Sequence, residues 1–172
     1  RSNIQRPYIR FEQRKPAGRD VVTTVGLTKA FDGAPLFENL NLEIQRGEKV
    51  AIIGSNGVGK TTLVRTLIGE LEPDAGTLKW GTGQTWGYYP QDNRIEAPEG
   101  MSALEWLQQF DTSGDQQVIR GLLGRMLFSG DESLKPVSAL SGGETARLLL
   151  ARIMLEQHPV LIFDEPTNHL DL

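Results

Sequence analysis

Residues 49–68, KVAIIGSNGVGKTTLVRTLI, contain the pattern that predicts the fold of this chain. The apolar run at 49–53 has the length and composition of a buried strand, and residues 60–68 read as a helix that Gly69 ends. Between the two lies a turn rich in glycine. A strand, a glycine-rich turn and a helix in this order are typical of α/β proteins with a parallel sheet, so we expect that fold class here.

The glycine-rich turn predicts a phosphate-binding loop, or P-loop. It matches the pattern GxxxxGK followed by Ser or Thr at all four fixed positions, Gly54, Gly59, Lys60 and Thr61. Glycines let backbone N–H groups turn toward phosphate oxygens, and the start of the helix adds a positive dipole end. Lys60 would bind the β- and γ-phosphates, and the Thr61 hydroxyl would be a ligand of Mg²⁺.

A chance match of a glycine-rich turn is the alternative, and the flanking strand and helix argue against it. We therefore expect ATP and Mg²⁺ as ligands. The residues that would line the nucleotide site are Ser55, Asn56, Gly57, Val58, Gly59, Lys60, Thr61 and Thr62.

A second motif, VLIFDE at residues 160–165, predicts hydrolysis as well as binding. A buried strand that ends on two adjacent carboxylates is costly unless something cationic or reactive lies there. Asp164 would hold Mg²⁺ through water, and Glu165 would orient and deprotonate the attacking water. A surface turn is the alternative for an acidic pair alone, but the P-loop upstream makes it the weaker interpretation.

A third motif, LSGGE at residues 140–144, stands at the start of an amphipathic helix. Ser141 and the two glycines would form a small anion-binding nest at the helix N-terminus. From the residues alone, a plain N-cap at Ser141 followed by a turn is the more common reading. The remaining pattern predicts further strands at 21–25, 40–44, 77–80, 85–89 and 160–163, and helices at 101–110, 115–123 and from 143 onward.

Composition places few other restrictions on function. The 172 residues carry a net charge of −4, contain no cysteine, and show no apolar run of the roughly 18 residues that a membrane helix needs. Residues 1–19 hold six basic side chains and one acidic side chain, whereas residues 20–172 are acidic. We expect 1–19 to be a basic linker or arm and 20–172 to be a domain. A polyanion partner for the arm and a solvated linker without a partner stay open as alternatives.

Together these motifs resemble ATP-binding cassette proteins, and the resemblance covers residues 20–172. It implies a RecA-like parallel core sheet, an antiparallel β subdomain and a helical subdomain with the signature motif. It also implies that the signature, here Ser141, Gly142, Gly143 and Glu144, contacts the γ-phosphate of an ATP that a second cassette holds.

The resemblance also implies roles for three further residues. Gln91 matches the Q-loop glutamine that approaches Mg²⁺ and the attacking water. Phe31 matches the aromatic residue that stacks on adenine, and a core phenylalanine is the alternative. Asp171 matches the D-loop aspartate at the contact between cassettes.

Two details are similar to the ABC-F group, which are cytosolic proteins with two cassettes and no membrane domain that act on ribosomes. The signature ends in Glu144, where transporter cassettes usually have glutamine, and residues 164–171 read DEPTNHLD. The basic arm looks like the end of the linker between the two cassettes. The resemblance implies a cytoplasmic ATPase whose partners are a second cassette and, through the arm, the ribosome or its RNA.

The sequence also departs from the cassette pattern. His169 is not the switch histidine, which in this family follows on a later strand, so we expect a C-terminally truncated cassette. The missing strand lies between the P-loop strand and the Asp164 strand in such folds. We therefore expect exposed neighbours of that strand, and either low stability or a neighbouring segment that completes the sheet. The first cassette, with the opposite half of each ATP site, is also absent, so we expect weak nucleotide binding and little hydrolysis by the chain alone.

Two other functions fit parts of the pattern. The ATPase subunit of an ABC membrane transporter is one, although the arm and Asn168-His169 argue against it. A DNA-repair or chromosome-structure cassette is the other, but the interval 63–139 is too short for its coiled coil and carries no heptads.

Overall fold

The computed structural model describes residues 6–166, which divide into two compact units. The sheet unit comprises Lys15–Trp86 with Pro159–Ile162. The helical unit comprises Gly87–His158 with the described parts of Arg1–Arg14 and Phe163–Leu172. Each unit is described by itself below.

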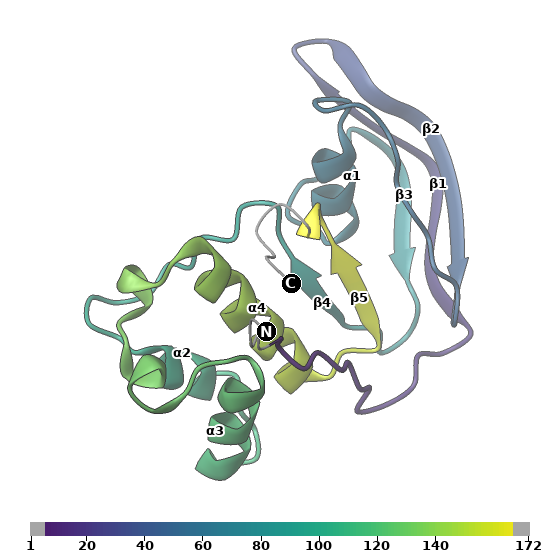
Figure 1. The fold of residues 1–172 in the computed structure, drawn as a ribbon. Helices are drawn as coiled ribbons and strands as arrows, with labels where there is room; N and C mark the ends of the chain where they lie inside the picture. Colours follow the sequence, from purple (N-terminus) through teal and green to yellow (C-terminus); the bar gives the residue numbers. More distant parts are fainter. Residues whose placement is uncertain (1–5, 167–172) are drawn as a thin grey trace. The chain divides into compact units, whose positions relative to one another are not determined.

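The sheet unit contains a three-stranded antiparallel sheet in the order β2-β1-β3 (Figure 1). Its strands are β1 (Asp20–Phe31), β2 (Ala34–Gln45) and β3 (Ala75–Trp80). β1 and β2 form a hairpin whose turn, Asp32 and Gly33, has positive φ at both positions, as tight hairpin turns require. This sheet confirms the antiparallel β subdomain.

Helix α1 (Lys60–Leu67) packs its apolar face on this sheet. Leu63 and Leu67 are four residues apart, so they lie on the same side of the helix. They contact a cluster that includes Val21, Val22, Leu27, Phe37, Leu40, Ile44, Leu78 and Trp80. This packing holds the start of α1, and therefore the end of the P-loop, in a defined place in the sheet unit.

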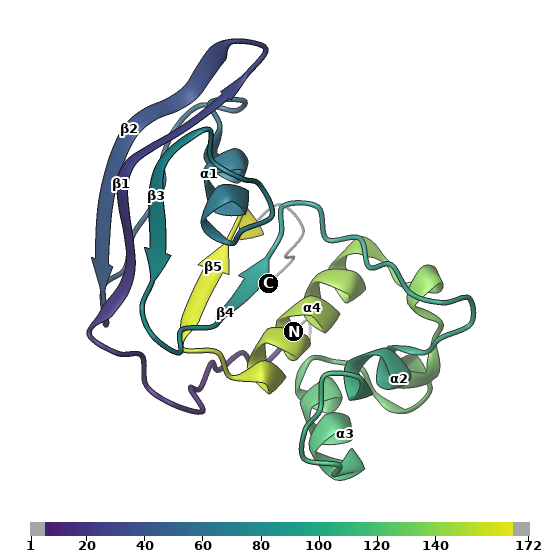
Figure 2. The ribbon, with the colours of Figure 1, turned by 180° about the vertical axis from the view of Figure 1, so that it is seen from behind.

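The helical unit is built from α2 (Ala103–Gln108), α3 (Gln116–Arg125) and α4 (Gly142–Glu156), with two 3₁₀ turns, η1 (Gly130–Leu134) and η2 (Val137–Ala139), before α4 (Figure 2). The three α-helices contact one another, and their shared core contains Leu107, Ile119, Leu123, Met126 and Leu148. Ser102 caps α2, because its side chain accepts from the backbone N–H of Glu105.

Strands β4 (Trp86–Tyr89) and β5 (Val160–Phe163) form a second sheet. The N–H of Asp164, just after β5, donates to the carbonyl of Tyr89, the last residue of β4, at 2.9 Å. The C-terminal ends of the two strands therefore lie side by side, which is the parallel arrangement. The acidic pair that follows β5 and the Q-loop that follows β4 therefore begin next to each other.

The predicted strand at 49–53 is wrong for this structure. Residues 49–53 are in no ladder within the described part of the chain, and Ile53 is 92% exposed. A parallel core strand forms only when neighbouring strands satisfy its N–H and C=O groups, so an apolar run alone does not produce one.

The other predicted elements are present with small shifts at their ends. The hairpin strands extend beyond 21–25 and 40–44, and α4 begins at Gly142. The expected boundary at residues 19 and 20 differs from the division of the structure, in which the units separate after Arg14. Residues 6–14 belong to the helical unit, where hydrogen bonds attach them to α3 and to the end of α4.

A matched pair of leucine substitutions tests the core of the helical unit. Leu107→Ala removes a fully buried side chain and should lower the free energy of unfolding by about 2–5 kcal/mol. Leu134→Ala makes the same change at an exposed position and should cost less than about 0.5 kcal/mol. Urea titrations followed by circular dichroism measure both, and equal losses would contradict the assigned core.

Candidate functional site

The P-loop in the sheet unit depends on two glycines with positive φ. Gly57 has φ 80°, and Gly59, the N-cap residue just before α1, has φ 101°. A side chain at Gly59 would also be crowded, because its Cβ would lie 3.2 Å from Cβ of Leu36. Both backbone conformation and space therefore call for glycine at Gly59.

The start of α1 presents positive charge. Lys60 donates from Nζ to the carbonyls of Gly54 at 2.9 Å and Ser55 at 3.0 Å, so its ammonium lies over the loop. No acidic residue occupies the first turn of α1, so nothing there offsets the positive end of the helix dipole. The loop, the helix start and Lys60 together have the chemistry of a phosphate site, with Thr61 and Thr62 in the first turn.

Phe31 lies at the end of β1, beside the hairpin turn, and is 48% exposed. The hairpin reaches the P-loop through the contact between Leu36 and Gly59. An exposed ring is not part of the core, so the alternative that Phe31 is a core phenylalanine is wrong. Its stacking on adenine stays a prediction.

The helical unit carries the acidic pair and the Q-loop residue. Gln91 donates from Nε2 to Oε2 of Glu165 at 3.2 Å. Glu165 has φ 49°, in the left-handed region that non-glycine residues rarely adopt, and such strain is typical of functional positions. The structure therefore brings together two of the residues predicted for catalysis.

Asp164 has a different environment from Glu165. Its side chain is buried, and Oδ2 has no hydrogen-bond partner in the described part of the chain. An unpaired buried carboxylate oxygen is costly, and a cation would relieve that cost. Asp164 therefore fits the predicted role as a Mg²⁺ site, although residues 6–166 contain no group of three or more His, Cys, Asp or Glu side chains that could hold a metal.

The LSGGE segment forms a complete cap for α4. Glu144 Oε2 accepts from the Ser141 N–H at 2.7 Å, and the Glu144 N–H donates to Ser141 Oγ at 3.3 Å. The N-cap interpretation is confirmed, and the role of Ser141, Gly142, Gly143 and Glu144 toward a second ATP stays a prediction. The cap leaves the N–H groups of the two glycines without intrahelical partners, as at any helix start.

Two polar residues that the sequence analysis missed hold this segment. Asn93, which is buried, donates from Nδ2 to the carbonyl of Gly142 at 3.0 Å. Lys135 donates from Nζ to Glu144 Oε1 at 2.9 Å. Neither contact follows a local motif. The only signal for Asn93 is its place two residues after Gln91, and Lys135 carries none.

The pKa of Glu144 is lowered from 4.5 to about 2. The main cause is the hydrogen bond from the Ser141 backbone, followed by the one from Lys135. Both bonds favour the charged form, so the carboxylate is ionised at neutral pH.

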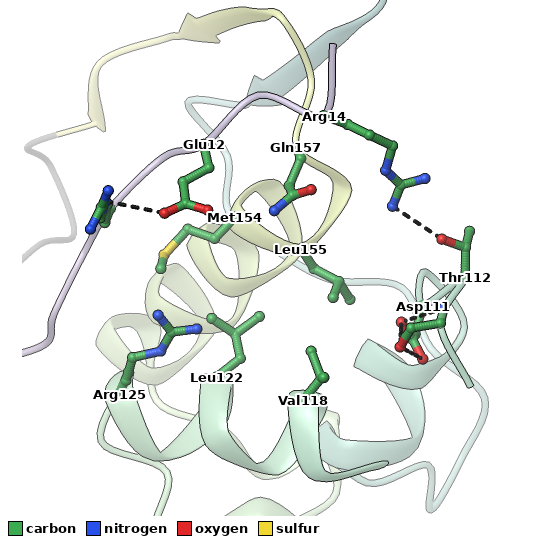
Figure 3. A pocket seen from close by; sticks show the side chains of 12 residues that line it. Glu12, Arg14, Asp111, Thr112, Val118, Leu122, Arg125, Met154, Leu155 and Gln157 are labelled. Carbon is green, nitrogen blue, oxygen red and sulfur yellow. Dashed lines mark hydrogen bonds and ion pairs between the residues drawn. The ribbon is translucent and has the colours of Figure 1, made fainter. Parts of the chain in front are cut away.

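The described part of the arm, residues 6–14, lies against α3 and the end of α4. Tyr8 donates its N–H to the carbonyl of Arg125, and Arg14 donates its N–H to that of Gln157. Arg14 also donates from Nη2 to Thr112 Oγ1 at 3.1 Å, and a pocket of about 210 Å³ opens between these segments (Figure 3). The arm is thus attached to the helical unit at several points.

Asp171, together with Asn168 and His169, lies outside the described residues. Within residues 6–166, no helix has the length and apolar character to cross a membrane.

Comparison with known proteins places these features in a family. Residues 37–168 match the family model described as ABC transporter. The chain belongs to this family. The match contains both the P-loop and the LSGGE segment, so the predicted ATP-binding cassette fold is confirmed.

The chain is similar over nearly all its length to several ABC-F-type proteins. It is 49% identical to the probable ATP-binding protein YbiT of Escherichia coli O157:H7, over 99% of this chain and 32% of that protein. It is 39% identical to ABC transporter F family member 2 of Arabidopsis thaliana, over 98% of this chain and 26% of that protein. The chain thus spans about a quarter to a third of the length of these relatives.

Solved structures of ABC proteins show the same fold. An inward-facing putative metal-chelate type ABC transporter is 26% identical, with a TM-score of 0.69 over 90% of this chain and 63% of that chain. A bacterial Atm1-family ABC exporter with ATP bound is 23% identical, with a TM-score of 0.75 over 92% of this chain and 32% of that chain.

The low pKa of Glu144 predicts how stability changes with pH. Because the folded pKa lies below the ordinary value of 4.5, the carboxylate stabilises the fold above about pH 4.5. That contribution should disappear as the pH falls to about 2. We expect the stability difference between the wild type and Glu144→Gln, measured by urea unfolding, to be constant above pH 5 and to vanish through this window. A pH-independent difference would contradict the assigned pKa.

Proposed function

We propose that this chain is the ATP-binding and ATP-hydrolysing cassette of a cytoplasmic ABC-F-type protein that acts on the ribosome. The observation that supports hydrolysis most directly is the group at the ends of β4 and β5. There a buried oxygen of Asp164 lacks a partner, and Gln91 hydrogen-bonds to a strained Glu165. Together with a P-loop in the same chain, this group has the residues that phosphoryl transfer to water requires.

Each residue has a distinct role in the proposed reaction. Lys60 and the P-loop N–H groups bind the β- and γ-phosphates, and Phe31 stacks on the adenine. Thr61, Gln91 and, through water, Asp164 would hold Mg²⁺, and the ion would supply positive charge to neutralise the phosphate oxygens. Glu165 accepts a proton from water while the water oxygen attacks the γ-phosphorus. The bond from that phosphorus to the β–γ bridging oxygen breaks, and ADP and phosphate result.

The proposal includes a second cassette on the same protein. Ser141 to Glu144 would face the γ-phosphate of the ATP that the first cassette binds, and that cassette's own signature would complete the P-loop site described above. Asp171 would lie at the contact between the two cassettes. Under this proposal one cassette alone binds nucleotide weakly and hydrolyses very little, because the other cassette supplies half of each site.

The ribosome is proposed as the partner on two grounds. The arm carries six basic side chains within residues 1–19, and phosphate contacts depend on such charge. The relatives include proteins named as F family members, and no rival accounts for both the arm and residues 164–171.

The ATPase subunit of a membrane transporter is a second candidate, and the similarity to a putative metal-chelate type transporter favours it. The two candidates differ in a measurable way, because a transporter subunit should co-purify with membrane-spanning partners and an ABC-F-type protein should co-sediment with ribosomes.

Two lysine substitutions, one at the P-loop and one on β3, test nucleotide binding. Lys60→Ala removes the ammonium at the P-loop and should weaken binding of a fluorescent ATP analogue at least about tenfold. Lys79→Ala removes the same charge from an exposed position on β3 and should leave the affinity for the ATP analogue unchanged. Equal affinities of the two variants would argue against the P-loop as the binding site.

Glu165→Gln in the full-length protein tests hydrolysis and the ribosomal role together. The amide retains the shape and the hydrogen bond with Gln91 but cannot accept the proton from water, so turnover should fall by at least about a hundredfold. The variant should then remain on ribosomes with ATP, as seen by sedimentation through sucrose. If it leaves ribosomes with ATP as readily as without it, the ribosomal proposal fails.

A further inference from the structure

The ion pair between Lys135 and Glu144 has a consequence for the start of α4. We propose that Lys135 is a positioning residue of the signature segment. By holding Glu144 and neutralising its charge, Lys135 allows this segment to bind a γ-phosphate. This inference rests on the proposed function, in which residues 141–144 receive the phosphate of an ATP bound by a second cassette.

Glu144 creates an electrostatic problem at this place. It lies in the first turn of α4, beside the N–H groups of Gly142 and Gly143 that are to receive the phosphate. Its hydrogen bond with the Ser141 N–H keeps the carboxylate in its charged form. An anionic side chain beside an anion-binding helix start repels the ligand that the helix dipole attracts.

Lys135 removes this problem. Its Nζ lies 2.9 Å from Glu144 Oε1, and the contact raises the pKa of Lys135, so the ammonium stays charged. The side chain of Lys135 is 42% exposed and that of Glu144 is 16% exposed, so the cation is the more accessible partner. A phosphate that approaches α4 therefore meets a neutralised carboxylate and an exposed positive charge.

The backbone around Lys135 is held in place from the other side. The carbonyl of Lys135 accepts from the N–H of Ala103 at 3.0 Å, and the N–H of Val137 donates to the carbonyl of Met101 at 2.8 Å. Lys135 is thus attached to the segment that begins α2, and its side chain connects that segment to the start of α4. An ammonium with a fixed backbone positions Glu144 better than one on a mobile loop.

Another ion pair, which also involves a glutamate of α4, provides a matched control. Arg152 Nε lies 3.0 Å from Glu156 Oε1, with exposures of 40% and 17% that are close to those of the Lys135 pair. This pair is near the other end of α4, away from the signature segment. Loss of Arg152 also removes one positive charge that pairs with a glutamate of α4, but none from the proposed phosphate site.

The test measures ATP hydrolysis by the full-length two-cassette protein as a function of ATP concentration. Lys135→Met should raise the ATP concentration for half-maximal turnover about tenfold, because an uncompensated carboxylate then faces the phosphate. Lys135→Arg should restore this concentration to within about twofold, because the charge and the hydrogen bond are retained. Lys135→Met combined with Glu144→Gln should recover most of the loss, and Arg152→Met should leave the concentration unchanged.

The combined variant distinguishes charge balance from a structural role. If it is no better than Lys135→Met alone, or if Lys135→Met matches the wild type, the inference is overturned. If Lys135→Met does not fold, Lys135→Gln replaces it, since the amide can still donate to Glu144 but carries no charge, and the same rise is expected. Lys60→Ala reports on the proposed function separately: if it hydrolyses ATP as well as the wild type, the proposed function itself fails.

Discussion

The hydrogen bond from the Asp164 N–H to the Tyr89 carbonyl is the interaction on which the arrangement of Gln91, Asp164 and Glu165 depends. It aligns the C-terminal ends of β4 and β5, and side chains that follow parallel strands meet at that edge of a sheet. As a result Gln91 reaches Glu165, although the two are 74 positions apart in the chain. The same edge keeps one oxygen of Asp164 buried and without a partner, which suits a cation.

The starts of α1 and α4 meet the same constraint in opposite ways. Each leaves N–H groups without intrahelical partners and carries a positive dipole end. α1 begins on Gly59 in a left-handed conformation, has no acidic residue in its first turn, and places Lys60 over the loop. α4 begins on Ser141 with a full capping box, so it acquires an acidic residue, Glu144, that Lys135 then neutralises. The start of α1 thus presents a positive charge from its own Lys60. At the start of α4, the negative charge of Glu144 is neutralised by Lys135, which lies outside the helix.

Much of the fold could be predicted because its signals are local. The caps at Ser102 and Ser141 depend on residues three positions away, and the P-loop depends on backbone conformations that glycine alone adopts easily. Alternation and β-branched residues located the hairpin strands. The run at 49–53 has the same kind of apolar signal, yet it forms no strand in this structure, because a strand requires hydrogen bonds from other strands.

The sequence by itself determined which segments are candidates for phosphate chemistry: the P-loop at 54–62, the acidic pair at 164–165 and the signature at 140–144. These are runs in which each residue's role follows from its immediate neighbours. Only the tertiary structure decided which distant side chains join them, namely Gln91 with Glu165, Asn93 with Gly142, and Lys135 with Glu144. Such contacts depend on how strands and helices pack, and a polar side chain far away in the sequence carries no local sign of the partner that packing gives it.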